Sequence, residues 1–394
     1  MPTSHLAVPS TTATATDNRR RPSLHKLWRR SSAWALLYLS VLHLVPAESH
    51  ADGRSGTWTG ALQGALHYYY ERSTRVFMPE VQISVESPSG ERLRAGYLLD
   101  VITSASVFAG ASDDRLSDEY RHAPVLGLGK TFNLDDFRLS ADATAQYSRE
   151  NDYESFSAYA DVGLYLNSDN SIFHLGVGHL RDRIFTNPSA NFRGNLTGWS
   201  SQLTYEQVLN PLMVLTMGYQ FGHQEGYLGN AYRKVGLQAA EQMEQPPSTR
   251  FRHGLSGRLA IYVPPAELAV HLLSRVYIDS WDVKGITPEI RLYKELGPWL
   301  MLRLRYRFYA QTPAEFYRRT YPRDWEGPFT GDYKLAPLHS HTLGFRVDFD
   351  LGALEQTPLG FISDSTIYLS LNRVLTNHFY GNETVGTGGG ILRF

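Results

Sequence analysis

The chain has 394 residues, a length that fits two or three soluble domains or one transmembrane β-barrel of roughly 16 strands. Its 38 Lys and Arg residues nearly balance its 39 Asp and Glu residues, which excludes the broad basic field that nucleic-acid binding requires. The lack of cysteine excludes disulfides, Cys nucleophiles and thiolate metal sites. The 24 Tyr, 18 Phe and 33 Gly residues favour strands and tight turns.

The N-terminal segment has the pattern of a secretory signal peptide. Basic residues, among them Arg19–Arg21, precede an apolar run from Ala33 to Val45, which is too short to span a bilayer as a helix. Pro46 ends this run, and Ser49-His50-Ala51 supplies small residues for a signal peptidase. We therefore expect a cleaved signal peptide at residues 1–51 and a single barrel domain at residues 52–394.

The mature chain alternates polar and apolar residues with the period of a β-strand. From Leu139 to Ser148 every odd position is apolar and every even position polar. From Met301 to Phe308, apolar residues alternate with three arginines. No run of about 18 apolar residues follows the signal segment, so a membrane protein built from this chain must be a closed barrel.

Strand patterns recur along the whole mature chain, separated by residues that favour turns. They predict an all-β, antiparallel, up-and-down transmembrane barrel of about 16 strands. The expected strands are 62–72, 76–87, 91–103, 119–133, 136–148, 153–167, 171–181, 197–209, 212–225, 251–263, 267–280, 284–296, 299–310, 338–350, 365–375 and 386–394.

The links between these strands alternate in length. Short links with turn residues occur at 87–90, 133–135, 167–170, 210–211, 264–265 and 297–298, and longer links occur at 104–118, 182–196, 226–250 and 311–337. Short turns at one rim and long loops at the other are typical of outer-membrane barrels. The last strand ends at Phe394, and we expect the barrel-assembly machinery of the outer membrane to recognise this strand.

The polar positions of the strands are expected to face the lumen, while the apolar positions face the outer-membrane lipid. The first half supplies mainly acids and the second half mainly arginines, so we expect a transverse field across the lumen. The alternative is a set of structural ion pairs that fill the interior. The candidate lumen residues are Glu71, Glu86, Asp100, Asp142 and Asp161, with Arg94 as an exception, and then Arg252, Arg258, Arg275, Arg291, Arg303, Arg305, Arg307 and Arg346, with Asp279, Glu289 and Asp348 among them.

The link at 311–337 is rich in aromatic and charged residues, including Tyr317, Arg318, Arg319 and Trp325. This composition predicts an ordered exterior loop. The loop could fold inward to constrict a pore, present a surface to a partner, or only cap the barrel. The link at 226–250 is expected to be more mobile.

Other motifs give little support for metal binding, catalysis or nucleotide binding. His339 and His341 share one face of a strand, but no third metal ligand is evident, and they are expected to face outward near the exterior rim. No Gly-x-Ser-x-Gly motif marks a hydrolase nucleophile, and the segments at 127–129 and 386–390 lack the Lys-Ser/Thr of a nucleotide-binding loop. We expect neither enzymatic activity nor a cofactor or metal.

The segment from Arg305 to Gln311, followed by Gly331–Leu335, resembles an uncharacterised family of bacterial barrels, domain of unknown function 3570. Further resemblance lies at 68–71, 100–106, 150–153 and 232–235, although Val107-Phe108 departs from the expected run of small residues. The resemblance implies an outer-membrane location and carries no established activity.

These observations lead to one main hypothesis and one alternative. The main hypothesis is a porin-like channel or transport component for small solutes or ions, in which inward charges set selectivity. The alternative is a non-conducting barrel that serves as a scaffold for an envelope or surface-exported assembly. A barrel of about 16 strands encloses a lumen too wide for its wall side chains alone to fill, which favours the channel.

Overall fold

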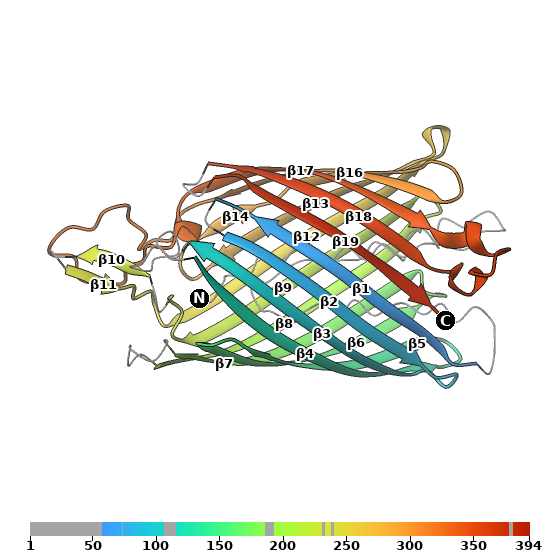
Figure 1. Cartoon of the computed structure of the whole chain (residues 1–394), viewed down its shortest axis with the longest axis horizontal. Coiled ribbons are helices and arrows are strands. Elements are labelled where there is room, and N and C mark those ends of the chain that lie inside the picture. The colour runs from blue at the N-terminus through green and yellow to red at the C-terminus, as the bar shows by residue number, and fades with distance from the viewer. Residues whose placement is uncertain are drawn as a thin grey trace.

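The computed structural model describes residues 57–72, 74–105, 116–185, 193–230, 233–237, 240–377 and 381–394. The expected signal peptide at residues 1–51 and the Val107-Phe108 segment lie outside these residues. The described strands form one closed antiparallel barrel whose strands slant across the cylinder (Figure 1). The barrel runs from β1 to β9, continues with β12 to β19, and closes where β19 pairs with β1.

The strand bounds follow the alternating segments of the sequence closely. The first nine strands are β1 (Thr59–Tyr70), β2 (Thr74–Glu86), β3 (Glu91–Ala105), β4 (Leu116–Asn133), β5 (Arg138–Arg149), β6 (Tyr153–Leu166), β7 (Ser171–Phe185), β8 (Arg193–Asn210) and β9 (Met213–Gly226). The remaining barrel strands are β12 (Thr249–Val263), β13 (Leu268–Asp279), β14 (Lys284–Ile286), β15 (Glu289–Glu295), β16 (Leu300–Gln311), β17 (Leu338–Asp350), β18 (Thr366–Thr376) and β19 (Glu383–Arg393).

The expected strand at 284–296 is interrupted. It forms β14 and β15, which both pair with β13 and β16 and therefore occupy one position in the barrel. Pro288 lies at the break, where its missing N–H would remove a ladder hydrogen bond. Counted this way, the 17-stranded sheet is a 16-position barrel, which confirms the expected fold.

The two rims of the barrel differ, as expected from the link lengths. One rim carries short turns, such as the link 167–170, where Asn167, Ser168 and Asp169 all have left-handed backbone conformations. The residues of this rim also include the start of β1 and the end of β19. The link at residues 351–365, which the expected strands at 338–350 and 365–375 already left between them, holds the short helices η3 (Leu351–Leu354) and η4 (Gly360–Ile362). A third short helix, η1 (Pro264–Ala266), lies in the β12–β13 turn.

The other rim carries the larger exterior loops. The link between β9 and β12, which we expected to be mobile, contains a hairpin of β10 (Lys234–Leu237) and β11 (Ala240–Met243). This hairpin projects beyond the end of the barrel (Figure 1). The link between β16 and β17 lies at the same rim and contains the helix η2 (Tyr333–Leu335).

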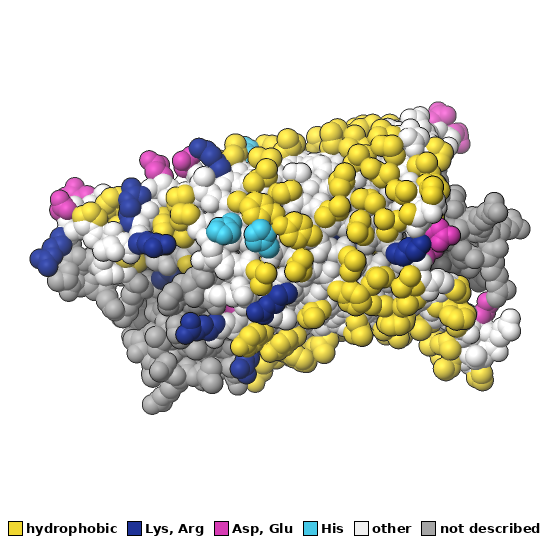
Figure 2. All heavy atoms as spheres, turned by 90° about the horizontal axis from the view of Figure 1, so that it is seen from above, with side chains coloured by type: hydrophobic (Ala, Val, Ile, Leu, Met, Phe, Trp, Pro, Cys, Tyr) yellow, Lys and Arg dark blue, Asp and Glu magenta, His cyan; other side chains and the backbone are white. Residues whose placement is uncertain are grey.

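A belt of apolar side chains covers the outside of the cylinder. Figure 2 shows them over the middle of one face, with many of the charged side chains toward the two ends. Leu128, Leu255 and Leu369 are each about 60% exposed, which would be costly in water but is expected against lipid tails. The described residues contain no helix long and apolar enough to cross a membrane. The belt and the closed sheet identify a barrel of the outer membrane.

The seam between β1 and β19 closes the barrel. The pairing extends from Ala61 opposite Arg393 to Tyr70 opposite Thr384, and Gly60 and Phe394 exchange backbone hydrogen bonds of 2.7 and 3.0 Å. A Cβ atom at Gly389 would lie 2.7 Å from the Gly64 carbonyl oxygen and 2.7 Å from the Tyr368 hydroxyl. Glycine at 389 therefore lets β1, β18 and β19 approach closely. Recognition of this last strand by the assembly machinery stays a prediction.

Substitution of this seam glycine should destabilise the closed barrel. Gly389→Ala is expected to lower the free energy of unfolding by about 1–3 kcal/mol, because the backbone at Gly64 cannot move aside cheaply. The matched control is Gly386→Ala on the same strand, where a Cβ would meet no atom within 4 Å. Denaturant unfolding of the refolded barrels in detergent measures the free energy of unfolding of both variants. Equal unfolding midpoints for the two variants would show that the seam tolerates the added methyl group.

Candidate functional site

The inner wall of the barrel is the candidate functional site. In β16 the outward Leu304 is 45% exposed, whereas Arg303 beside it is 5% exposed on the opposite face. Alternation of this kind holds in the neighbouring strands, because successive side chains of a strand point to opposite faces. The arginines of these strands consequently point into the barrel.

The wall from β12 to β17 has an excess of positive charge. Its described inward side chains comprise nine arginines and five carboxylates. The arginines are Arg250, Arg252, Arg258, Arg275, Arg291, Arg303, Arg305, Arg307 and Arg346, and the carboxylates are Asp279, Glu289, Glu295, Asp348 and Asp350. We call this part of the barrel the arginine wall.

Within the arginine wall, like charges face each other across neighbouring strands. Arg291 lies opposite Arg305, and Arg303 lies opposite Arg346. Like charges directly opposite one another destabilise a sheet, so this arrangement needs compensating negative charge.

Carboxylates on the same strands supply part of this compensation. Glu289 binds Arg291 and also accepts a hydrogen bond of 2.8 Å from Arg305. Asp348 accepts a hydrogen bond of 2.9 Å from Nε of Arg346, whose guanidinium also stacks 3.9 Å from the centre of the Tyr368 ring. These contacts hold the guanidinium groups along the wall.

Arg258 shows that the ion pairs also reach across two strand positions. Its guanidinium donates 2.9 Å hydrogen bonds to Glu206 of β8 and to Thr216 of β9. Arg275 lies near Gln220 at 3.4 Å, and Arg307 faces Glu289 in register. Nε of Arg303, Arg305 and Arg307 is buried without a hydrogen-bond partner among the described atoms.

The wall from β1 to β9 has the opposite balance. Its described inward side chains comprise seven carboxylates and four arginines. The carboxylates are Glu80, Glu86, Asp100, Asp142, Asp161, Asp182 and Glu206, and the arginines are Arg92, Arg94, Arg121 and Arg138. The two parts of the wall thus carry opposite net charge.

Several acids expected in the lumen lie in ion pairs here. Asp142 binds both Arg92, at 2.7 Å, and Arg94. Asp100 binds Arg121 at 2.5 Å. Arg94, the exception in the sequence pattern, is therefore a partner of Asp142. The sequence interpretation missed Arg92 and Arg121, although their alternating positions in β3 and β4 could have identified them.

The remaining acids expected in the lumen lie at different heights of the wall. Asp161 lies 2.8 Å from Nδ1 of His174. Glu71 follows β1 at the exterior rim and accepts a 2.9 Å hydrogen bond from Tyr69. Glu86 lies near the short-turn rim, opposite Arg92.

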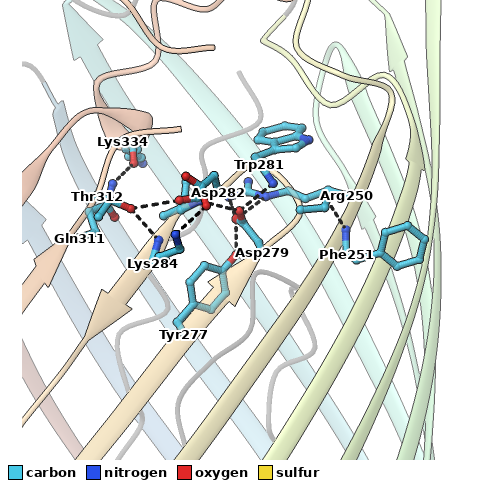
Figure 3. A network of polar contacts seen from close by, with 12 residues as sticks. Arg250, Phe251, Tyr277, Asp279, Trp281, Asp282, Lys284, Gln311, Thr312 and Lys334 are labelled. Carbon is cyan, nitrogen blue, oxygen red and sulfur yellow. Dashed lines mark hydrogen bonds and ion pairs between the residues drawn. The ribbon is translucent and has the colours of Figure 1, made fainter. Parts of the chain in front are cut away.

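A polar network fixes the exterior ends of β12 and β13 (Figure 3). Asp279 accepts hydrogen bonds from Arg250 Nε at 2.9 Å, from the Tyr277 hydroxyl at 2.7 Å and from the Trp281 backbone N–H at 2.9 Å. The Arg250 guanidinium lies 4.1 Å from the centre of the Trp281 ring. These contacts set the β13–β14 turn against the barrel mouth.

The exterior loop at 312–337 packs against both this turn and the β10–β11 hairpin. Phe316 and Leu335 form one apolar cluster with Trp281, and Tyr321 and Phe329 form another with Val235. Gln245 and Phe329 exchange backbone hydrogen bonds of 3.0 and 3.1 Å. We call the described residues of 227–248, together with residues 312–337, the exterior projection.

The four loop residues selected from the sequence lie in the exterior projection. Tyr317 packs against the Trp281 cluster, and Trp325 packs against the Tyr321 cluster. Arg318 is exposed, donates to the backbone carbonyl groups of Glu315 and Tyr317, and lies 5.3 Å from the centre of the Trp325 ring. Arg319 is exposed.

Glu244 is the buried polar centre of the exterior projection. It accepts hydrogen bonds from the Asn230 backbone N–H and from Thr330 Oγ1 at 2.7 Å, and it pairs with Arg233 at 3.1 Å. Burial raises the pKa of Glu244 above its ordinary value, and the positive charge of Arg233 opposes that rise. This carboxyl group therefore makes its full contribution to the free energy of unfolding at pH values below its pKa in the unfolded chain. That contribution declines as the pH rises through the raised pKa of the folded protein.

The two histidines considered as metal ligands face outward. The hydroxyl of Tyr306 lies 2.9 Å from Nδ1 of His341, and the rings of His339 and His341 are 6.4 Å apart. Over the described ranges, no group of three or more His, Cys, Asp or Glu residues is arranged to hold a metal ion.

Removal of Glu289 should expose the repulsion within the arginine wall. Glu289→Gln is expected to cost about 3 kcal/mol of unfolding free energy, because Arg291 and Arg305 both lose their carboxylate partner. The double variant with Arg305→Gln should recover part of this loss. A double-mutant cycle by denaturant unfolding measures the coupling, and strictly additive effects would contradict the ion pair.

Removal of Glu244 should loosen the exterior projection and leave the barrel intact. Glu244→Ala is expected to increase proteolytic cleavage within 227–248 and 312–337 severalfold, because three donors lose their acceptor. The exposed Glu326→Ala in the same loop serves as the control. The wild-type loops should resist protease better at pH 5 than at pH 8. Unchanged cleavage in Glu244→Ala would show that this carboxylate does not hold the projection together.

Comparison with known proteins gives a family match and structural likenesses. Residues 183–361 match the model of a family described as protein of unknown function (DUF3570). No curated protein matches the chain. The matched range includes the whole arginine wall and the whole exterior projection.

Solved structures of outer-membrane proteins are similar at low sequence identity. OccD3 (OpdP) from Pseudomonas aeruginosa is 13% identical, with a TM-score of 0.44 over 86% of this chain and 91% of that one. CdiB from Acinetobacter baumannii is 12% identical, with a TM-score of 0.46 over 85% and 60%. A mutant of the ferric enterobactin receptor PfeA from Pseudomonas aeruginosa is 10% identical, with a TM-score of 0.44 over 82% and 54%.

The chain therefore spans little more than half the length of the receptor that it matches. The closed 16-position sheet and the apolar belt are properties of this chain itself. The closed barrel and its apolar belt show an outer-membrane β-barrel, and residues 183–361 of it are similar to the uncharacterised family that the sequence resemblance named.

Proposed function

We propose that this protein is an outer-membrane channel for small solutes or ions, with a preference for anions set by the arginine wall. The observation that carries the proposal is the placement of arginines at facing register positions of β15, β16 and β17, with Arg291 opposite Arg305 and Arg303 opposite Arg346. A wall that only needed to be stable would avoid like charges at facing positions.

The excess of arginine on one wall supports selectivity for negative solutes. Nine inward arginines against five carboxylates leave an excess of four positive charges between β12 and β17. In a narrow space with low-dielectric walls, fixed charges concentrate counter-ions and repel co-ions. Guanidinium groups also donate forked hydrogen bonds that fit carboxylate and phosphate groups. No covalent chemistry is required of the wall.

Single-channel recording in a planar bilayer tests this proposal. The wild-type protein is expected to show discrete open steps with anions more permeant than cations. Replacing Arg303, Arg305 and Arg307 together by Ala should reduce the anion-to-cation permeability ratio severalfold, because three inward charges are lost.

The control carries the same number of substitutions outside the wall. Arg318, Arg319 and Arg323 are exposed in the loop at 312–337, and changing all three to Ala should leave the permeability ratio close to that of wild type. Equal permeability ratios in the wild type and the wall variant would contradict the assignment of selectivity to β16.

A second candidate function is a non-conducting scaffold for an envelope or surface assembly. The exterior projection favours it, because two loops pack into an ordered unit that extends beyond the barrel. A silent bilayer with a correctly folded protein would favour this scaffold over the channel.

A further inference from the structure

A patch of arginines lies on the outside of the barrel, at the exterior ends of β5, β7 and β8. It consists of Arg149, Arg181, Arg183 and Arg193, all exposed. The side chains of Arg149 and Arg183 are 65% and 63% exposed. These residues alternate with buried inward residues such as Asp182, so they belong to the lipid-facing surface and not to the lumen. We call them the outer arginine patch.

The strand register fixes the height of the outer arginine patch relative to the apolar belt. Arg181 lies opposite Thr197, and two residues closer to the membrane centre, His179 lies opposite Trp199. Their rings are 4.3 Å apart. Val177 and Leu175 follow in the belt. Aromatic side chains mark the level of the membrane–water interface in such barrels, so the arginines lie just outside it, at the level of lipid headgroups.

The patch has more positive than negative charge. Glu154 lies 3.8 Å from both Arg149 and Arg183, and one acid cannot neutralise two guanidinium groups. Glu225 of β9 pairs in register with Thr197 of β8. Among the described residues, it is the second outward-facing acid near the patch, after Glu154. Four arginines against two carboxylates leave a net positive charge at the exterior interface.

The short-turn rim provides a contrast within the same molecule. Two partly exposed lysines there each have an acidic partner: Lys130 lies 2.6 Å from Glu91, and Lys294 lies 3.3 Å from Glu267. Protein carboxylates compensate these lysines, whereas the acids in the described part of the exterior surface leave the outer arginine patch with a net positive charge. Since the long loops mark the exterior rim, the negative charge that balances it would come from the outer leaflet.

We propose that the outer arginine patch binds the phosphate groups of an outer-leaflet lipid headgroup. Arginine is suited to this role because its planar fork can donate two parallel hydrogen bonds to one phosphate. The aromatic row beneath the patch, with His179 and Trp199, provides the apolar contact that the glycerol or sugar backbone and upper acyl chains of such a lipid require. This site is independent of solute passage through the lumen.

Native mass spectrometry of the folded full-length barrel tests the proposal. The probes are diphosphorylated lipid A and its dephosphorylated form, each added to the protein in neutral detergent. The wild type is expected to retain the phosphorylated lipid, and Arg181→Gln with Arg183→Gln should weaken that retention on the order of 30-fold. Inorganic phosphate in excess should compete only weakly if the lipid headgroup and chains both contribute.

The matched control is Lys130→Gln with Lys294→Gln, which removes two partly exposed positive charges from the opposite rim. It should retain the lipid as the wild type does. A gel-shift assay with and without heating establishes that every variant is folded. Equal retention by the arginine variant and the wild type, or equal retention of the two lipid forms, would overturn the proposal.

Discussion

The structure depends on one constraint: in a lipid bilayer every backbone N–H and C=O group must find a partner within the protein. A sheet meets this requirement only by closing, and the pairing of β1 with β19 completes the ring. Closure then determines the environment of each side chain in a strand, because successive residues face the lipid and the lumen in turn. The exposed Leu304 and the buried Arg303 of β16 are two consequences of the same geometry.

The period of two explains why so much of the fold could be predicted from the sequence. Apart from the three-residue β14, the barrel strands show the alternation over enough residues to be recognised. A register slip by one residue would place arginines in lipid. The departures have local causes. Pro288 interrupts one strand, and β10 and β11 are too short to give a periodic signal.

The partners within the wall were less predictable than the wall itself. Alternation assigns Arg94 and Asp142 to the inner face, but they are 48 residues apart and meet only because β3 and β5 flank β4 at a particular register. The same applies to Arg258 and Glu206. The packing of the exterior projection was equally difficult to predict from the sequence, because the contact of Gln245 with Phe329 joins two loops that are distant in the chain. Sequence therefore indicates which charges face inward, and tertiary structure decides which of them pair.

The proposed channel function requires that the arginine wall face a water-filled lumen. The chain has no cysteine, so a single cysteine can be placed in turn at each position from 303 to 308 and its reaction with a charged, membrane-impermeant thiol reagent measured in the folded barrel. The account predicts fast labelling at 303, 305 and 307 and slow labelling at 304, 306 and 308, with the reverse order for a lipid-soluble reagent. Uniformly slow labelling at the three arginine positions by the charged reagent would contradict it.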